Sequence, residues 1–194
     1  VRSGRFLDSD TPNIAGIFDQ AKLAAGAAIQ AADFALHDHD AFSLMRPPGH
    51  HATRTHLMGF CYFNNIAIAV ASILEAGTKP KSHDYDHGMA PKRVAILDFD
   101  CHHGNGTEDI FHGHPNVLFV SLHQSPCYPG TGESNRGNCI NYPLTPNTTE
   151  QQYLVAFEDA LRKISEYKPD LLAVSAGFAA YREDPITKMT LDIG

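Results

Sequence analysis

Two short segments of this chain carry side chains whose types and spacing suit metal-assisted hydrolysis. In the first, a Pro-Pro-Gly turn leads into the adjacent histidines His50 and His51. In the second, Asp98, Asp100 and His102 alternate along the chain. Residues two apart in an extended segment point the same way, so these three side chains are expected to share a face. Because carboxylate with imidazole makes a good partial zinc site, we predict Asp100 and His102 as metal ligands and Asp98 as a group that orients its neighbours.

The histidine pair suits proton transfer beside such a metal. Two imidazoles that can be neutral can act as general base and general acid, one deprotonating a bound water and the other protonating a leaving amine. Each imidazole needs a partner that fixes the proton on one ring nitrogen, and Asp98 and Asn105 are available for that role. Taken separately, the histidines could be a solvated loop pair, and the array a buried strand end bonded to backbone amides. Together they favour catalysis.

Two further groups of residues fit either a structural or a functional role. The Gly-Asn-Gly run at residues 104–106 can form a tight turn, since Gly and Asn favour positive φ, and it would also position Asn105. Gly59 and Phe60 could be ordinary core, or they could wall a narrow channel for an aliphatic chain, with Tyr128 as a second aromatic wall. The residues alone leave both possibilities open.

The composition excludes several classes of protein. A net charge of −7 and a pI near 5.9 argue against binding to a phosphate backbone, although an acidic rim could attract a basic substrate. No apolar run approaches the roughly 18 residues that span a bilayer, and the N-terminal residues have no apolar signal core. The four cysteines are far apart, so we expect reduced thiols in a cytoplasmic protein that binds neither nucleic acid nor membrane.

The elements around these motifs can be predicted from periodicity and capping signals. With 43% hydrophobic residues the chain can bury one core, so we predict a single domain over residues 1–194. Helices, the first starting at Thr11-Pro12, are expected over residues 11–36, 64–76 and 149–167. Apolar runs typical of parallel strands buried on both faces lie at residues 93–98, 117–122 and 170–176, with a shorter run at 41–45 and a surface loop at 78–92. This alternation indicates an α/β fold, an open and mostly parallel sheet with helices on both faces.

Each expected strand is followed at its C-terminal end by polar residues. His50 and His51 follow the first strand, residues 100–103 the second, His123 the third and residues 177–184 the last. Open α/β sheets bind ligands in the crevice outside the C-terminal ends of their strands. The sequence therefore predicts one site along a single edge of the sheet.

Five motifs in order resemble the zinc-dependent histone deacetylase family. They are RPPGHHA at residues 46–52, GFCYFNN at 59–65, ILDFDCHHGNGTEDIF at 96–111, SLHQSPCYPGTG at 121–132 and the frame AGFxAxxxDP at 176–185. The likeness covers residues 11–194, and Asn105, where other branches have Asp, is similar to the class II branch and its prokaryotic relatives. The resemblance implies a three-layer arginase-deacetylase fold and hydrolysis of an acetyl amide on lysine or a polyamine.

The resemblance also implies roles for individual residues. The catalytic group comprises His50 and His51 with their orienting partners Asp98 and Asn105. Two of three zinc ligands are matched by Asp100 and His102. A structural potassium site, formed largely by backbone carbonyls, is matched by Asp98, Asp100, His102, Ser121 and Leu122. The aromatic walls of the acyl-lysine tunnel are matched by Phe60 and Tyr128, and the glycine whose carbonyl accepts a hydrogen bond from the substrate amide by Gly59.

This chain departs from the family pattern in two ways. In the family frame AGFDAxxxDP the aspartate after Phe is the third zinc ligand, and here that position is Ala179, while Asp184 matches the later, non-ligating aspartate. Loss of a ligand should weaken zinc binding severely, since loss of a residue that only supports a ligand typically lowers metal affinity by about 10- to 100-fold. The alanine is either an engineered change or the mark of a natural inactive relative. No residue matches the family's carbonyl-polarising tyrosine in a later Gly-Tyr motif, so we expect an incomplete domain with an exposed sheet edge.

Functions from different classes fit these residues. The first is a zinc-dependent deacetylase of acetylated lysine in peptides or proteins, or of an acetylated amine, impaired by Ala179 and truncation. An acetylpolyamine amidohydrolase shares every motif. The second is a non-catalytic acyl-lysine binding module whose tunnel survives without hydrolysis. A binuclear, arginase-like hydrolase would need further carboxylates beside Asp98 and Asp100, which the sequence does not offer. Nothing in the sequence fixes the oligomeric state.

Overall fold

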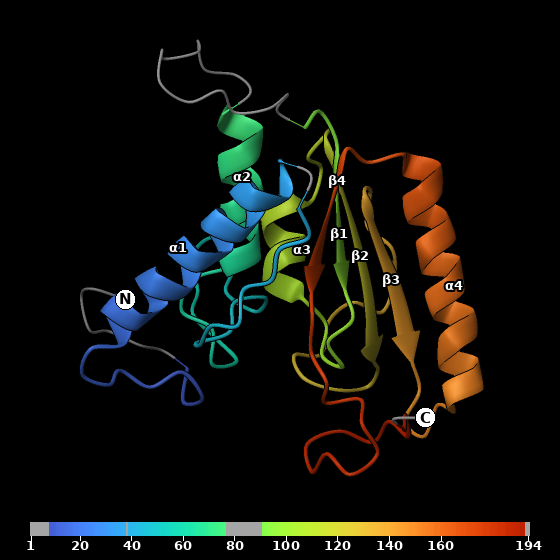
Figure 1. Cartoon of the computed structure of the whole chain (residues 1–194). Coiled ribbons are helices and arrows are strands. Elements are labelled where there is room, and N and C mark those ends of the chain that lie inside the picture. Colours follow the sequence, from blue (N-terminus) through green and yellow to red (C-terminus); the bar gives the residue numbers. More distant parts are fainter. Residues whose placement is uncertain (1–7, 38, 77–90, 193–194) are drawn as a thin grey trace.

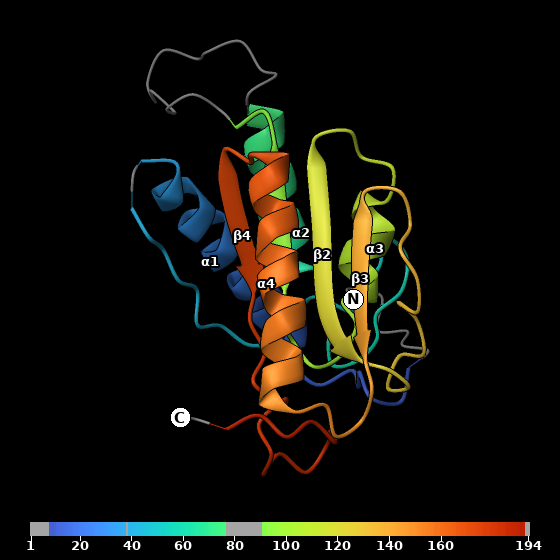
Figure 2. The ribbon, with the colours of Figure 1, turned by 90° about the vertical axis from the view of Figure 1, so that its right-hand side faces the viewer.

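The computed structural model describes residues 8–37, 39–76 and 91–192. Within these ranges the elements in chain order are α1 (Ile17–Ala35), α2 (Asn65–Ala76), β1 (Val94–Asp98), α3 (Asn105–Phe111), β2 (Val117–Gln124), β3 (Cys139–Leu144), α4 (Glu150–Tyr167) and β4 (Leu171–Ser175). They form three layers with the sheet in the middle (Figures 1 and 2). The helices α1, α2 and α3 lie on one side of the sheet, and α4 lies on the other. The predicted α/β fold, with helices on both faces of an open parallel sheet, is confirmed.

The sheet has the strand order β3-β2-β1-β4, and each neighbouring pair is parallel. In this register, Asp98 at the end of β1 lies opposite Ser121 in β2 and Ser175 in β4. Because the strands run the same way, their C-terminal ends meet at one edge of the sheet. The loops that follow β1, β2 and β4 are therefore neighbours, and these are loops in which the sequence places its polar motifs.

Two hydrophobic clusters hold the layers together. Side chains alternate between the faces of a strand, so β1 contributes Val94 and Ile96 to one cluster and Ala95 and Leu97 to the other. The first cluster packs β1 and β2 against α2 and α3, and the second packs them against α4. Both strands are buried along their whole length, as predicted for strands covered on two faces.

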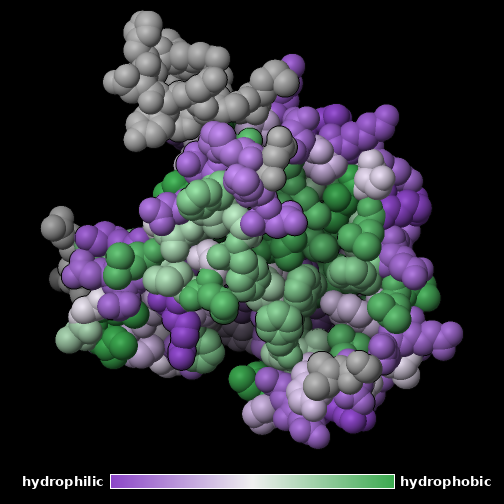
Figure 3. All heavy atoms as spheres, viewed as in Figure 1, coloured by the Kyte–Doolittle hydropathy of each residue, from purple (hydrophilic) through white to green (hydrophobic). Residues whose placement is uncertain are grey.

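The strand β4 differs because it is an edge strand of the described sheet. Its residues are only partly buried, and Leu172 and Val174 are 43% and 46% exposed. The prediction that residues 170–176 are buried on both faces is therefore wrong. Figure 3 shows apolar side chains gathered over the side of the molecule on which β4 lies. Such an edge can pair with another segment, and it agrees with the exposed sheet edge expected from the sequence.

The start of the first helix was predicted wrongly. The helix α1 begins at Ile17 with Gly16 as its N-cap, rather than at Thr11. The Thr11 side chain is fully buried, and its hydroxyl oxygen accepts a hydrogen bond from the backbone N–H of Phe60 at 3.1 Å. Thr11 therefore anchors a loop near the candidate site and does not cap a helix.

The predicted short strand at residues 41–45 is wrong, and the predictions for the loop at 78–92, the cysteines and membrane spans have different outcomes. Residues 41–45 form no strand, because the described sheet offers them no partner, and Phe42 and Leu44 are 70% and 86% exposed. Most of the expected surface loop at residues 78–92 lies outside the described residues. The four cysteines are free thiols, as expected. None of the helices in the described ranges is long and apolar enough to cross a membrane.

The two other predicted helices are confirmed, and polar caps explain where they begin. The N–H of Gln152 donates to the Thr149 hydroxyl at 3.3 Å, and the Gln152 side chain accepts from the Thr149 N–H at 3.0 Å, which is a capping box at the start of α4. Asn64 precedes α2, and its side-chain oxygen accepts a hydrogen bond from the N–H of Ala67 at 3.1 Å.

The sequence did not predict β3 or α3, and the tight turn expected at residues 104–106 is wrong. Gly104 has a φ of −75° and caps the N-terminus of α3, and Asn105 and Gly106 are already helical. A short helix that contains glycine in its first turn has a weak signal. These glycines are needed because neighbouring groups pack closely against their backbone, and not because φ is positive. A Cβ at Gly106 would overlap the carbonyl of Ala52, and one at Gly104 would overlap the carboxylate of Asp98.

We predict that Gly106→Ala lowers the free energy of unfolding by about 1–3 kcal/mol, because the added methyl must push the backbone of Ala52 away. Gly26→Ala is the matched control. Gly26 lies inside α1 with open space around it, so alanine there should be neutral or stabilise the fold by up to about 1 kcal/mol. Urea unfolding followed by circular dichroism measures both. Equal stability of the two variants would contradict the close approach of α3.

Candidate active site

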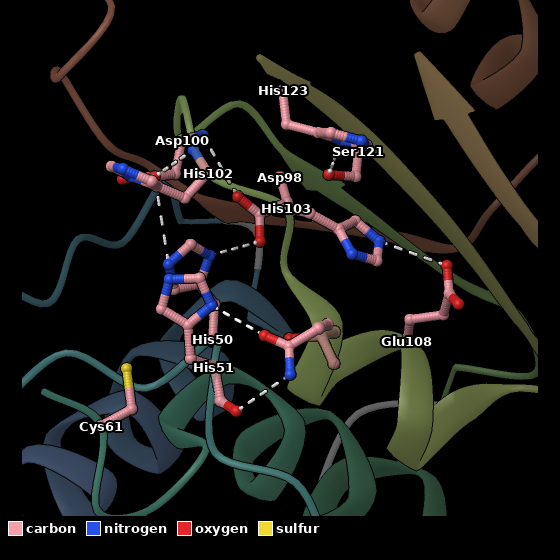
Figure 4. A network of polar contacts seen from close by, with 12 residues as sticks. His50, His51, Cys61, Asp98, Asp100, His102, His103, Glu108, Ser121 and His123 are labelled. Atoms are coloured by element: carbon pink, nitrogen blue, oxygen red, sulfur yellow. Dashed lines mark hydrogen bonds and ion pairs between the residues drawn. The ribbon is translucent and has the colours of Figure 1, made fainter. Parts of the chain in front are cut away.

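Six polar side chains that the sequence links to catalysis gather at the C-terminal end of β1 (Figure 4). They are His50, His51, Asp98, Asp100, His102 and Asn105. The two histidines come from the turn before α2, and Asp98 is the last residue of β1. Asp100 and His102 lie in the loop that follows β1, and Asn105 is the first residue of α3. The structure therefore brings both motifs into one site, and the chemical roles of these residues stay predictions.

His50 is bonded to a fully buried carboxylate. Its Nδ1 lies 3.0 Å from Oδ2 of Asp98, and the other oxygen of Asp98 accepts a hydrogen bond from the N–H of Asp100 at 3.1 Å. Two N–H groups in the first turn of α3, those of Gly106 and Thr107, donate to the carbonyl of His50 at 3.0 and 3.2 Å. Burial works to lower the pKa of His50, but the carboxylate of Asp98 outweighs it and the pKa is raised. His50 is thus held to favour a positive charge.

His51 is bonded to a neutral amide. Its Nδ1 lies 2.7 Å from the side-chain oxygen of Asn105. The amide nitrogen of Asn105 is directed at two acceptors, the sulfur of Met58 at 3.3 Å and the carbonyl of His51 at 3.5 Å. Because the amide nitrogen faces these acceptors, its oxygen faces the ring, and Nδ1 of His51 must carry the proton. The lone pair of His51 is then on Nε2.

The two adjacent rings therefore differ in their pKa, which is raised for His50 and lowered for His51. Their centroids are 4.0 Å apart. Burial, and then the charge of His50, lower the pKa of His51 to about 3, although the bond to Asn105 acts in the opposite direction. At neutral pH the site holds an uncharged imidazole with a free lone pair beside one that favours a positive charge.

Asp100 and His102 form a pair of possible metal donors. Oδ1 of Asp100 lies 3.1 Å from Nδ1 of His102 and accepts a hydrogen bond from the His102 N–H at 2.7 Å. Burial works to raise the pKa of Asp100, but the bonds from His102 and the charge of His50 bring it down to about 2. Asp100 is therefore an ionised oxygen donor at neutral pH.

A third metal donor is missing from the described residues. Across these ranges no three His, Cys, Asp or Glu side chains gather in a way that could hold a metal ion. Catalytic zinc sites usually have three protein ligands. The residues present, Asp100 and His102, therefore do not fit a catalytic zinc site.

Position 179 lies close to the segment that carries these donors. Gly177 packs so tightly against the carboxylate of Asp100 that a Cβ there would overlap it. Ala179 packs against the small apolar cluster of Cys101, Ala180 and Met189. Cys101 stands between Asp100 and His102 in the chain. The loop after β4 thus runs beside the donor segment, which is consistent with the predicted place of a third ligand.

Tyr128 stands over the histidines. Its ring is edge-on to His51 at a centroid distance of 5.1 Å and to His102 at 6.4 Å. The side of Gly59 faces Tyr128 and His51, and a Cβ at Gly59 would come 3.0 Å from the tyrosine ring. Tyr128 is still 38% exposed. Tyr128 is thus a partly exposed ring beside the two histidines, and its role as a wall of an acyl-lysine tunnel stays a prediction.

Phe60 is held at the surface by its own backbone. It is 60% exposed and has a φ of +66°. This left-handed conformation is supported by the bond from its N–H to Thr11 and by the neighbouring bond from the N–H of Gly59 to Asp8 at 3.0 Å. Phe60 is therefore not ordinary core, and exposure favours the alternative of a wall residue.

Sequence reasoning missed a second polar cluster, which lies next to the first (Figure 4). It contains the buried side chains of His103, Glu108 and His123. Their spacing in the sequence matches no metal or catalytic motif. Their contacts with Thr131 and Gly132 depend on the path of the loop after β2, which the sequence does not predict. The position of His103 and His123 after two of the expected strands predicted that they lie at the same edge of the sheet, but it gave them no role and no link to Glu108.

We predict that Asn105→Asp raises the pKa of His51 from about 3 toward its ordinary value of 6.5, because a carboxylate would then face Nδ1. Titration of the histidine ring carbons by NMR measures this, with the signal of His51 assigned by His51→Gln. Asn147→Asp, an exposed site with the same change in charge, should leave the pKa unchanged. An unchanged pKa of His51 in Asn105→Asp would contradict the geometry above.

The same shift has a consequence for stability. The pKa of His51 is lower in the folded chain than in the unfolded chain, so the unfolded chain takes up the proton first. The stability that comes from a neutral His51 in the folded chain is fully present above about pH 6.5. It is lost as the pH falls toward 3, by up to roughly 1 kcal/mol of the free energy of unfolding per pH unit. Asn105→Asp should reduce that loss, as measured by urea unfolding at several pH values.

The chain is similar over almost its whole length to known deacetylases. The family model described as histone deacetylase domain matches residues 2–194. A probable deacetylase of Archaeoglobus fulgidus is 40% identical over 98% of this chain and 52% of its own length. The histone deacetylase-like amidohydrolase of Pseudomonas aeruginosa is 39% identical over 97% of this chain and 49% of its own length.

A solved structure agrees with these matches. An acetylpolyamine aminohydrolase from Burkholderia pseudomallei is similar with a TM-score of 0.82 and 35% identity, over 96% of this chain and 54% of that one. The chain thus spans about half the length of the relatives it matches. By fold and sequence, it belongs to the histone deacetylase domain family.

Proposed function

We propose that the protein to which this chain belongs hydrolyses the acetyl amide of an acetylated amine to acetate and the free amine. The observation that carries this proposal is the pair of adjacent imidazoles, one facing the carboxylate of Asp98 and the other facing the amide of Asn105. Amide hydrolysis needs a base for the attacking water and an acid for the leaving nitrogen. The family and the names of the relatives support the same reaction.

In this proposal each histidine has its own task. His51 accepts the proton of the attacking water at Nε2 and returns it to the nitrogen as the carbon–nitrogen bond breaks, so that no net proton is gained or lost. His50, paired with Asp98, provides positive charge next to the oxygen on which negative charge develops. The low pKa of His51 makes it a weak base, so it can deprotonate only a water that is already acidified.

We further propose that this chain, as it stands, hydrolyses its substrate poorly or not at all. Zinc dependence is expected from the family, but Asp100 and His102 alone do not complete a three-ligand set. Without a metal, no group among the described residues acidifies the water for His51. The impairment would then lie at Ala179 and not in the proton-transferring pair.

The substrate class is proposed from two exposed aromatic residues and from the net charge. The rings of Tyr128 and Phe60 suit the aliphatic part of an acetylated lysine or polyamine. A net charge of −7 favours an amine substrate over an anionic one. We propose an acetylated lysine in a peptide or protein, or an acetylated polyamine.

We also propose, from the family likeness, a structural potassium ion at the ends of β1 and β2. The residues that would hold it are Asp98, Asp100, His102, Ser121 and Leu122.

A second candidate function is a non-catalytic module that binds acyl-lysine. Ala179 favours it, because the aromatic residues Phe60 and Tyr128 are present where the third metal ligand is absent. The two candidates differ when a carboxylate is restored at this position. An enzyme should regain hydrolysis of an acetyl-lysine peptide, whereas a binding module should bind the peptide without cleaving it.

We predict that Ala179→Asp raises the zinc content from far below one to about one zinc per chain. Elemental analysis after dialysis measures the stoichiometry. Ala179→Asn is the matched control, because it has nearly the same volume without the charge, and it should bind zinc far more weakly. Adding His102→Ala to the aspartate variant should abolish binding. Equal zinc in the parent and in Ala179→Asp would show that position 179 is not a ligand.

Hydrolysis is tested in a chain extended to the length of its relatives and carrying Ala179→Asp. Acetate release from an acetyl-lysine peptide and from an acetylated polyamine is expected with zinc, and the preferred substrate identifies the class. Replacement of His51 by Gln should lower kcat by about 100-fold or more, as loss of a general base does. Peptide binding without acetate release by the zinc-loaded chain would refute the enzyme and support the binding module.

A further inference from the structure

Two buried histidines outside the proposed chemistry lie directly under the loop that carries Tyr128. His103 and His123 are each 1% exposed, and their ring centroids are 4.6 Å apart. We name residues 125–132, which follow β2, the Tyr128 loop. Each of the two rings has a bonding partner at both nitrogens, and one partner of each lies in this loop.

His103 joins a buried carboxylate to the Tyr128 loop. Its Nε2 lies 3.2 Å from Oε2 of Glu108, and the same oxygen accepts a hydrogen bond from Asn141 at 2.7 Å. The other oxygen, Oε1, accepts one from Arg136 at 3.0 Å. Burial works to raise the pKa of Glu108, but these bonds bring it down to about 2, so the carboxylate is ionised and Nε2–H donates to it. The remaining nitrogen, Nδ1, bonds the hydroxyl of Thr131 at 2.8 Å.

His123 holds the next residue of the same loop. A carbonyl can only accept, so Nε2–H of His123 donates to the carbonyl of Gly132 at 3.0 Å, and Nδ1 accepts from the hydroxyl of Ser121 at 2.9 Å. Gly132 has a φ of +83°, and a Cβ there would come 2.6 Å from both His103 and His123. The backbone of the loop at Gly132 thus packs directly against the two rings, at a position that favours glycine.

The other end of the Tyr128 loop is fixed by backbone bonds. The N–H of Gln124 donates to the carbonyl of Cys101, and the N–H of Ser125 donates to the carbonyl of Leu144, both at 2.8 Å. Tyr128 lies between the two anchored ends, with its ring edge-on to His51. Its position therefore depends on the backbone bonds at one end and on the two histidines at the other.

We infer that His103 and His123 are positioning residues, which seat Tyr128 above the site by clamping Thr131 and Gly132. His103 directly follows the proposed donor His102, so the clamp also fixes the loop relative to the donor segment. The placement of Tyr128 follows from the geometry alone. Its effect on substrate binding rests on the proposed function.

The placement is tested by ¹⁹F NMR of the chain labelled with 3-fluorotyrosine. The protein has seven tyrosines, and Tyr128→Phe identifies the signal of Tyr128. Thr131 is exposed, so Thr131→Val removes the hydroxyl that bonds His103 with little risk to folding. We expect Thr131→Val to move the Tyr128 signal by more than its line width and to leave the other six in place.

Three variants serve as controls. Thr131→Ser keeps the hydroxyl and should keep the parent signal. Thr190→Val removes an exposed threonine hydroxyl elsewhere, one that donates to the carbonyl of Thr148 at 2.8 Å, and should also leave Tyr128 unmoved. His123→Gln retains a side-chain N–H donor and should shift the signal less than His123→Leu. An unmoved Tyr128 signal in Thr131→Val, or a change spread over all seven tyrosines, overturns the inference.

A kinetic measurement on the hydrolytically restored chain separates positioning from chemistry. There, Thr131→Val should raise KM about fivefold, as expected for loss of one hydrogen bond, while kcat changes less than about twofold. A fall in kcat with unchanged KM would contradict a positioning role. If no version of the chain hydrolyses amides, the proposed function fails, and the ¹⁹F result still decides the inference.

Discussion

The candidate site depends on one buried pair, the carboxyl group of Asp98 and the imidazole of His50. Burial raises the pKa of Asp98, and the bond to His50 acts in the opposite direction. Asp98 is fully buried at the end of β1, where an ionised group without partners would be strongly unfavourable. Its two oxygens are bonded by His50 and by the N–H of Asp100, and Gly104 leaves it the space it needs. Satisfying this carboxylate therefore draws the histidine turn, the donor segment and the start of α3 to one point.

A second buried carboxylate repeats this design a few residues further along the chain. Glu108 is bonded by His103, Asn141 and Arg136, and through His103 it reaches the loop that holds Tyr128. The first carboxylate raises the pKa of an imidazole in the site, and the second sets the position of an aromatic ring above it. Both act from the same edge of the sheet, because parallel strands bring their following loops together.

The strands β1 and β2 and the helices α2 and α4 could be predicted because continuous apolar runs and helical spacing with polar caps are local signals. The strand predicted at residues 170–176 exists as β4, but its burial was overestimated, and residues 41–45 form no strand. Burial depends on neighbours that a local pattern does not contain. The pairing of His50 and His51 with Asp98 and Asn105 followed from residue chemistry and the family likeness. The cluster of His103 and His123 was missed, because it exists only through contacts with a distant loop.

We propose that the candidate site is formed in this chain except for one metal ligand. The most direct test is a crystal structure of the Ala179→Asp variant grown with zinc. We expect one zinc at about 2.0–2.2 Å from Asp100, His102 and the new carboxylate. The hydrogen bond between His50 and Asp98 should remain as it is here. Zinc bound elsewhere, or a rearranged pair of histidines around it, would contradict the account.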